Sequence, residues 1–466
     1  MSKLFVAISL GFLLGCCVPV PAEAQQGTDQ PLLHSPRLVT LEKQLKSGDA
    51  AALDNFWREV KQQGTPLVEP IPGDDQRVLV TFLWHAKTPI KNVVLVDGPA
   101  ADDYPNNELT HLEGTELWYR TYRIRSDARF YYSFSVNDPL TFPTTDEEQA
   151  QRSPQPDPLS RHIITTPKDE DDPNDKEETG SALELPGAPS QPWVAARPGV
   201  SAGAVALHRF KSALLNNERR VWVYTPPGYS TKANPYGLLV LFMGWDYVHV
   251  IPTPTILDNL YAEKRIPPLV AVFVAQPLAL DIWARYRELQ MNDDFASFVA
   301  RELVPWIHEH YNITPDPART IVGGVSAGGR AAAFVALRHP GIFGNVLSQS
   351  GAFQNVLSPN QLDLAPAERW NGEHWGEYLT HEYAAAPKAP VRFYLEAGIY
   401  DLASFPKGPS VLLANRHLRD VLQAKGYTFR YSEFPGDHSE LYWKGMLADG
   451  LTFLIGSLGN DNDVNR

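Results

Sequence analysis

The amino-acid sequence predicts an α/β domain with a mainly parallel sheet, preceded by a smaller all-β sandwich domain. The first observation is that near-continuous apolar runs alternate with amphipathic helical stretches in residues 206–460, which is typical of parallel strands covered by helices on both faces. The second is a series of short β-branched and aromatic runs in residues 76–150, separated by Pro, Asn, Asp and Gly. The length of 466 residues leaves room for both domains and a large core.

Composition narrows the class of protein. The chain has 43% hydrophobic and 20% charged residues, which excludes a wholly disordered or fibrous protein. Its formal net charge of −13 makes nucleic acid an unsuitable partner. Both cysteines, Cys16 and Cys17, lie in the N-terminal segment, so the rest of the chain has no disulfide, thiol nucleophile or Cys-ligated metal site. We expect no metal cofactor.

The N-terminus predicts export. Residues 1–24 combine Lys3, an apolar run too short to span a bilayer, and the small residues of Ala22-Glu23-Ala24 at a cleavage position. A competing interpretation is that Leu13-Leu14-Gly15-Cys16 resembles the lipobox of bacterial lipoproteins, which would attach a lipid anchor at Cys16. We therefore expect a periplasmic or secreted protein, soluble or lipid-anchored, with no later transmembrane segment.

The front of the chain predicts three segments. In residues 25–75, apolar positions recur at helical spacing and are interrupted at Gly48, which predicts two short helices. Residues 76–150 carry several short strands, which predict a small β-sandwich of the immunoglobulin-like class. Residues 151–205 are Pro-rich and then acidic, and we interpret them as a solvated linker.

Strands and helices alternate in the following domain. The expected strands are residues 220–224, 238–243, 269–274, 320–325, 346–349, 391–396 and 428–434, and the helical stretches include 293–310 and 327–339. Chemistry in such sheets sits beyond the carboxyl ends of the strands. The motifs of interest should therefore follow these strands directly.

One strand ends in a serine motif. Residues 320–325 lead into Gly324-Val325-Ser326-Ala327-Gly328, with a helix after it. This Gly-x-Ser-x-Gly pattern is the nucleophile elbow of α/β-hydrolases, a strained strand-to-helix turn that exposes a serine hydroxyl above the sheet. The flanking glycines fit because strand and helix pack there without space for side chains. Ser326 is the candidate nucleophile.

A serine nucleophile needs a base and an orienting carboxylate, which follow it in the order acid, then His, in this fold. Asp401 follows the strand 391–396, and His438 follows the strand 428–434. These are the candidate acid and base, while Glu396 at its strand end is an alternative acid. The mechanism would be acyl transfer to Ser326 followed by hydrolysis.

The developing oxyanion needs hydrogen-bond donors. One is the backbone N–H of Ala327, the residue after the nucleophile. The second comes from the loop after the strand 238–243, where Gly244 or Trp245 is the candidate.

The chain resembles the enterochelin esterase family over nearly its whole length after the N-terminal segment. The matching residues include Phe56-Trp57, Val80-Thr81-Phe82-Leu83-Trp84, Gly114-Thr115-Glu116-Leu117-Trp118-Tyr119, Arg220-Val221-Trp222-Val223-Tyr224, Asp281, Arg285, Glu288-Leu289, Asn292, Phe295, Glu396-Ala397-Gly398, Asn415, and His438 with Trp443. So many matches in order are far more specific than the elbow alone.

The resemblance implies an immunoglobulin-like front domain on an α/β-hydrolase domain, no catalytic metal, and a catecholate siderophore ester as substrate, iron-loaded or iron-free. Arg285 would help to bind this anionic substrate, or would instead pair with Glu288. Arg330 is a further cation for the pocket. A feruloyl or acetyl carbohydrate esterase is the alternative function. Members with two such domains are typically cytoplasmic, and commonly have Asp-Gly where this chain has Met243-Gly244.

Overall fold

The computed structural model describes residues 35–100, 105–141, 152, 154–173, 175–278, 287–357, 376–402 and 410–456, all within one compact unit. The predicted export signal with Cys16, and Arg285, lie outside the described residues. Among the helices of the described ranges, none is both long and apolar enough to cross a membrane.

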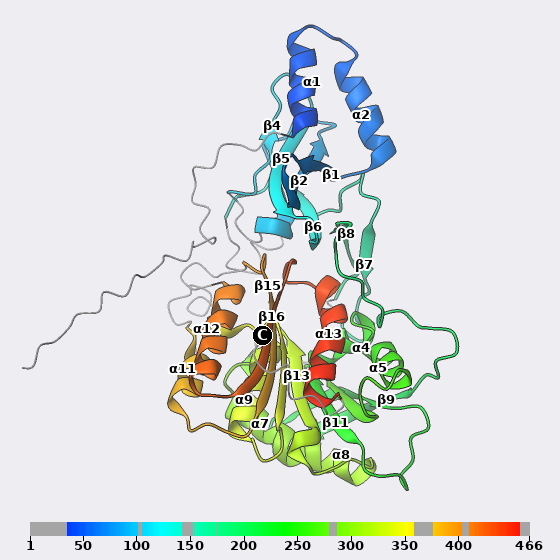
Figure 1. Ribbon diagram of the computed structural model, residues 1–466, viewed down its shortest axis with the longest axis vertical. Helices are drawn as coiled ribbons and strands as arrows, with labels where there is room; N and C mark the ends of the chain where they lie inside the picture. Colours follow the sequence, from blue (N-terminus) through cyan, green and yellow to red (C-terminus); the bar gives the residue numbers. More distant parts are fainter. Residues whose placement is uncertain are drawn as a thin grey trace, which may run out of the picture. The chain divides into compact units, whose positions relative to one another are not determined.

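Two helices open the described chain, in the range where helical spacing predicted them. Helix α1 (Pro36–Lys46) begins after Ser35, whose side chain accepts a hydrogen bond from the backbone N–H of Leu38. Helix α2 (Ala52–Gln63) follows, and both appear in blue in Figure 1. Their buried faces pack on the adjoining sheet through a cluster of Leu38, Leu41, Phe56, Trp57, Val60, Leu67, Leu83, Leu117 and Tyr119.

The front domain contains two antiparallel four-stranded sheets. The first has the order β1-β2-β5-β4, formed by β1 (Leu67–Ile71), β2 (Asp74–His85), β5 (Leu117–Arg125) and β4 (Thr110–His111). The second has the order β3-β6-β8-β7, formed by β3 (Val93–Asp97), β6 (Arg129–Val136), β8 (Glu178–Glu184) and β7 (Ile163–Thr166). Aromatic residues of both sheets, including Phe82, Phe130 and Phe134, share one buried core.

The segment that we interpreted as a linker, residues 151–205, contributes β7 and β8 to the second sheet. Its acidic run is also partly buried and paired, because Arg220 of the following domain forms ion pairs with Asp169 and Asp171. The buried guanidinium of Arg220 holds these two carboxylates in place, whereas in a solvated linker they would face water. The front domain therefore continues well past residue 150.

The second domain is built on one eight-stranded sheet of order β16-β15-β14-β13-β11-β12-β10-β9. Strands β11 to β16 pair in parallel, whereas β10 and β9 add an antiparallel edge, so the sheet is mainly but not wholly parallel. The strands are β9 (Ala204–Ser212), β10 (Asn217–Thr225), β11 (Gly237–Phe242), β12 (Leu269–Val274), β13 (Thr320–Val325), β14 (Asn345–Gln349), β15 (Arg392–Gly398) and β16 (Thr428–Phe434).

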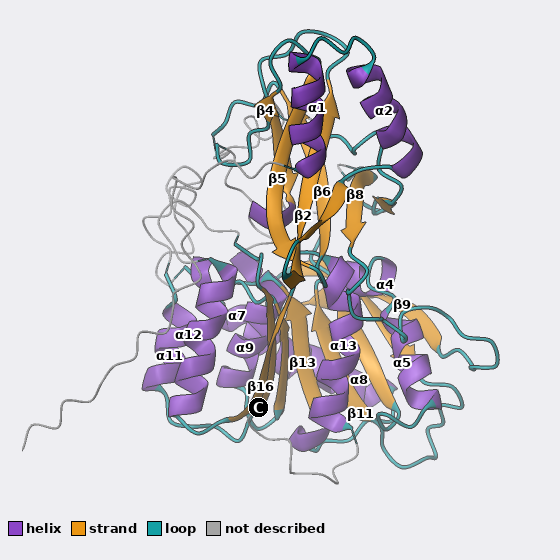
Figure 2. Ribbon diagram, turned by 45° about the horizontal axis from the view of Figure 1, so that its top comes forward, coloured by secondary structure: helices purple, strands orange, loops and turns teal. Residues whose placement is uncertain are grey.

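Helices cover both faces of this sheet, as Figure 2 shows. One buried cluster contains residues of α7 (Asp293–Phe298), α8 (Val304–His310), α9 (Ala327–Arg338), α11 (Tyr378–Ala385) and α12 (Val411–Ala424). The other contains residues of α4 (Gly244–His249), α5 (Thr253–Ala262) and α13 (Glu440–Ile455). Strands β11 to β14 are buried along their whole length, as expected for parallel strands between two helical layers.

Candidate active site

Ser326 occupies a strained turn between β13 and α9. Its φ of 51° and ψ of −121° lie in a region that side-chain-bearing residues rarely adopt. Its backbone N–H donates to the Gln349 carbonyl of the neighbouring strand at 2.9 Å. A Cβ on Gly324 would lie 2.5 Å from the carbonyl carbon of Gly328, so the turn tolerates only glycine there. The sequence pattern and the local geometry of a nucleophile elbow thus coincide.

The structure brings Asp401 and His438 together beyond the carboxyl ends of two paired strands. Asp401 follows β15, His438 follows β16, and Nδ1 of His438 lies 3.0 and 3.1 Å from the two carboxylate oxygens of Asp401. Asp401 is fully buried, whereas 29% of the His438 side chain is exposed. A carboxylate at Nδ1 favours the tautomer with a proton on Nδ1, which leaves Nε2 as an acceptor. This is the arrangement a general base needs.

Glu396, the alternative acid, has other partners. Its Oε1 accepts a hydrogen bond from Nε2 of Gln349 at 2.7 Å, and Gln349 in turn accepts one from the Tyr247 hydroxyl at 2.8 Å. Burial raises the pKa of Glu396 to about 8, so the group holds its proton at neutral pH. Glu396 belongs to a buried network inside the sheet, and Asp401 is the carboxylate that meets His438.

The two predicted sources of oxyanion donors are close to the elbow. Ala327 is the first residue of α9, where backbone N–H groups have no acceptor within the helix. Gly244 begins α4 one residue after β11 ends, and a Cβ there would lie 2.5 Å from the backbone of Phe273. Cγ of Met243 is 3.1 Å from the position of a Cβ on Gly328, so this loop packs against the elbow. Trp245 follows in the same first turn of α4 and is half-buried.

Arg330 does not have the role we predicted. It is fully buried, its Nε donates to the Leu289 carbonyl at 3.0 Å, and its Nη1 donates to the Ala352 carbonyl at 3.1 Å. A guanidinium with no exposed surface cannot contact a substrate that arrives from solvent. Arg330 instead ties the elbow helix to two neighbouring loops.

A cavity of about 250 Å³ adjoins the Asp401–His438 pair. Its second-domain wall includes Tyr400, Leu402, Asp437, Ser439 and Glu440, and its front-domain wall is formed by Asp97, Gly98, Tyr131, Thr166 and Glu178. Burial raises the pKa of Tyr131 to about 12, and the charges of Glu440, Glu178 and Asp97 add to the effect. Sequence reasoning missed the front-domain residues, because no spacing signal links positions as far apart as Tyr131 and His438.

Comparison with protein-family models identifies the family to which the chain belongs. A model described as "Enterochelin esterase, N-terminal" matches residues 79–194, and one described as "Putative esterase" matches residues 212–454. The chain belongs to the enterochelin esterase family. The first of these matches spans β7 and β8, in keeping with a front domain that includes them.

Curated relatives in this family cover most of the chain. An iron(III) enterobactin esterase of Dickeya dadantii is 29% identical over 88% of this chain and 95% of its own length. An iron(III) salmochelin esterase of Escherichia coli is 26% identical over 91% of this chain and 98% of its own length.

Solved structures of the enterochelin esterase family agree with the fold. The enterobactin esterase of Shigella flexneri, determined in the presence of enterobactin, is 26% identical with a TM-score of 0.62 over 85% of this chain and 97% of its own. The ferric enterobactin esterase of Salmonella typhimurium is 25% identical with a TM-score of 0.63, over 86% of this chain and 98% of its own. The second domain is an α/β-hydrolase domain.

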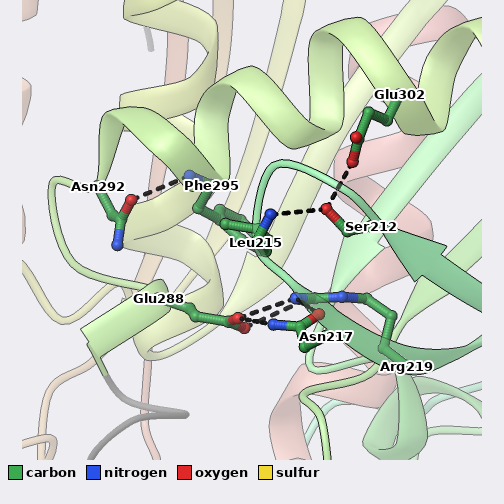
Figure 3. Close-up of polar contacts among 8 residues, drawn as sticks. All are labelled: Ser212, Leu215, Asn217, Arg219, Glu288, Asn292, Phe295 and Glu302. Carbon is green, nitrogen blue, oxygen red and sulfur yellow. Dashed lines mark hydrogen bonds and ion pairs between the residues drawn. The ribbon is translucent and has the colours of Figure 1, made fainter.

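Several residues that carry the enterochelin esterase resemblance hold the fold. Figure 3 shows Glu288, whose carboxylate accepts hydrogen bonds from Arg219 at 2.8 Å and from Asn217 at 2.9 Å. Asn292 caps α7 by accepting from the N–H of Phe295 at 2.9 Å. The ion pair between Arg219 and Glu288 is buried. Glu288, which we considered as a partner of Arg285, is thus bound by Arg219.

Proposed function

We propose that the protein is a serine esterase that hydrolyses the trilactone ester bonds of catecholate siderophores of the enterobactin type, through an acyl-enzyme on Ser326. The observation that carries the proposal is the contact of His438 Nδ1 with Asp401, at the sheet edge where the strained Ser326 follows β13. The relatives named as enterobactin and salmochelin esterases, which align over most of the chain, support this substrate class.

In the acylation step, Nε2 of His438 takes the proton of the Ser326 hydroxyl while Oγ of Ser326 attacks the ester carbonyl. Asp401 keeps the proton on Nδ1 and stabilises the imidazolium that forms. The backbone N–H of Ala327 and one from the first turn of α4 stabilise the oxyanion. The imidazolium then protonates the departing alkoxide, and a water molecule activated by His438 hydrolyses the acyl-enzyme.

The test uses purified protein from residue 25 onward with ferric enterobactin, iron-free enterobactin and a feruloyl ester. Chromatography should show linear dihydroxybenzoyl-serine products with the native protein and none with Ser326→Ala. Turnover of the feruloyl ester without cleavage of either enterobactin form would contradict the siderophore assignment and favour a carbohydrate esterase.

We also propose an immunoglobulin-like class for the front domain and export of the protein, which the two antiparallel sheets and residues 1–24 respectively support. Export predicts that the protein recovered from its native host begins near residue 25, or at a lipidated Cys16. A mature protein in the cytoplasm that still begins at Met1 would contradict it.

A further inference from the structure

The segment that joins β5 to β6 in the front domain, residues 125–131, contacts both catalytic loops of the second domain. We call it the β5–β6 segment. On the acid side, the backbone N–H of Arg125 donates to the hydroxyl of Tyr400 at 3.1 Å, and the ring of Phe130 packs edge-on against that of Tyr400 with centroids 4.9 Å apart. Tyr400 immediately precedes Asp401.

On the base side, the same segment holds the loop that carries His438. The N–H of Arg129 donates to the Pro435 carbonyl at 3.1 Å, and the N–H of Tyr131 donates to Oδ2 of Asp437 at 3.0 Å. Asp437 immediately precedes His438 and is buried, with 5% exposed. The residue before the acid and the residue before the base are therefore both hydrogen-bonded to one short front-domain segment.

The two loops are also bonded to each other, so that a displacement of one is transmitted to the other. The N–H of Tyr400 donates to the Gly436 carbonyl at 3.1 Å, and that of Ile399 donates to the Phe434 carbonyl at 2.8 Å. In α13, the helix that follows the base loop, the hydroxyl of Tyr442 donates to the carbonyl of Asp127 at 2.8 Å. The β5–β6 segment thus contacts the acid loop, the base loop and the helix that follows the base loop.

We propose that the β5–β6 segment positions the catalytic pair, with Tyr400 and Asp437 as positioning residues for Asp401 and His438. This inference rests on the proposed function only in requiring that His438 activates Ser326. The catalytic rate depends strongly on the positions of the catalytic side chains, since a displacement of about 1 Å can lower the rate about 100-fold. The front domain is then a working part of the catalytic site as well as a wall of the adjoining cavity.

The primary readout is the rate at which a fluorophosphonate labels Ser326, because it reports serine activation without any siderophore. Asp437→Ala removes the acceptor of the Tyr131 N–H, and we expect labelling to slow about 10-fold or more. Asp437→Asn keeps an acceptor oxygen of the same shape, so it should restore most of the rate. Tyr400→Phe keeps the ring and loses only the hydroxyl, and should slow labelling about 3-fold. With a p-nitrophenyl ester, kcat should fall while KM changes little.

Asp157 supplies a matched control. It is also buried, its Oδ2 accepts from the Tyr132 hydroxyl at 3.0 Å, and its Oδ1 accepts from the N–H of Leu159 at 2.9 Å. All of these partners lie within the front domain. Asp157→Ala should therefore destabilise the protein to a similar degree, measured by urea unfolding, without slowing the labelling of the protein that remains folded.

Equal slowing by Asp437→Ala and Asp157→Ala would overturn the proposal, because it would show a general structural effect. Should Asp437→Ala fail to fold, Tyr400→Phe decides the question, and a folded Tyr400→Phe protein that labels at the native rate would also overturn it. A native protein that labels but cleaves no enterobactin would refute the siderophore assignment alone. The positioning effect would then still be measured by the labelling rates.

Discussion

Replacing Glu396 by glutamine should stabilise the protein at neutral pH and leave catalysis intact. The side chain is fully buried, and burial raises its pKa to about 8 from an ordinary value of 4.5. In the unfolded chain the carboxyl ionises above its ordinary pKa, so between the two values folding must take up a proton. The stability of the native protein therefore falls as the pH rises through this window, and the loss is complete above about pH 8.

The size of the effect follows from the two pKa values. Each pH unit inside the window costs about 1.4 kcal/mol, so about 3 kcal/mol separates about pH 5 from about pH 7. Glutamine carries no titrating proton and keeps an oxygen to accept from Gln349. The difference in the free energy of unfolding between Glu396→Gln and the native protein should thus grow by about 3 kcal/mol over this interval. Other raised carboxyls, such as Asp437, titrate in both proteins and cancel.

Urea unfolding at the two pH values measures the stability difference, and ester hydrolysis measures the catalytic one. Glu396→Gln should keep kcat within about 3-fold of native, whereas Asp401→Asn should lose about 10⁴-fold because it fixes the wrong histidine tautomer. A Glu396→Gln protein as inactive as Asp401→Asn would refute the assignment of the acid. A stability difference that does not change with pH would refute the burial argument.

Three further predictions test other parts of the structure. Gly324→Ala forces a Cβ to 2.5 Å from backbone of the elbow helix, and should destabilise by about 1 to 3 kcal/mol in thermal unfolding, while Gly341→Ala, with nothing within 4 Å, should be nearly neutral. Glu178→Gln and Glu440→Gln each remove a negative charge from the wall of the cavity. At low salt, each should raise kcat/KM for an anionic ferric catecholate about 2-fold more than kcat/KM for the iron-free ester. An equal increase for both forms would show that repulsion between these carboxylates and the substrate is not the cause. Arg330→Met should lower the free energy of unfolding by about 3 kcal/mol and leave KM unchanged in a steady-state assay. A raised KM would show that Arg330 contacts the substrate after all.

Local signals explain what the sequence could predict. The apolar run 320–325 became β13 with the expected bounds, because glycine and β-branched residues mark a buried strand that ends in a tight turn. Ser326 could be selected for the same reason. The choice of Asp401 over Glu396 could not be made firm from the sequence, since both lie near the end of β15 and only their hydrogen-bond partners distinguish them.

The features that sequence reasoning missed depend on distant partners. A stretch of prolines and acidic residues separates β7 from β8, so only the pairing of the two strands in the sheet with β6 identifies them as part of the front domain. Arg330 sits beside the elbow in sequence, and its burial follows from carbonyls that other loops bring to it. A cation next to a nucleophile in the chain need not face the same space.

The contacts of the β5–β6 segment also set the order in which an active molecule can arise during synthesis. Arg125 and Tyr400 are 275 residues apart in the chain, and Tyr131 and Asp437 are 306 apart. The front half leaves the ribosome long before the strand that delivers His438. A nascent or truncated chain that lacks His438 is therefore inert, whatever part of it has already folded. Hydrolysis begins only when the last part of the chain docks, so activity itself reports that the molecule is complete.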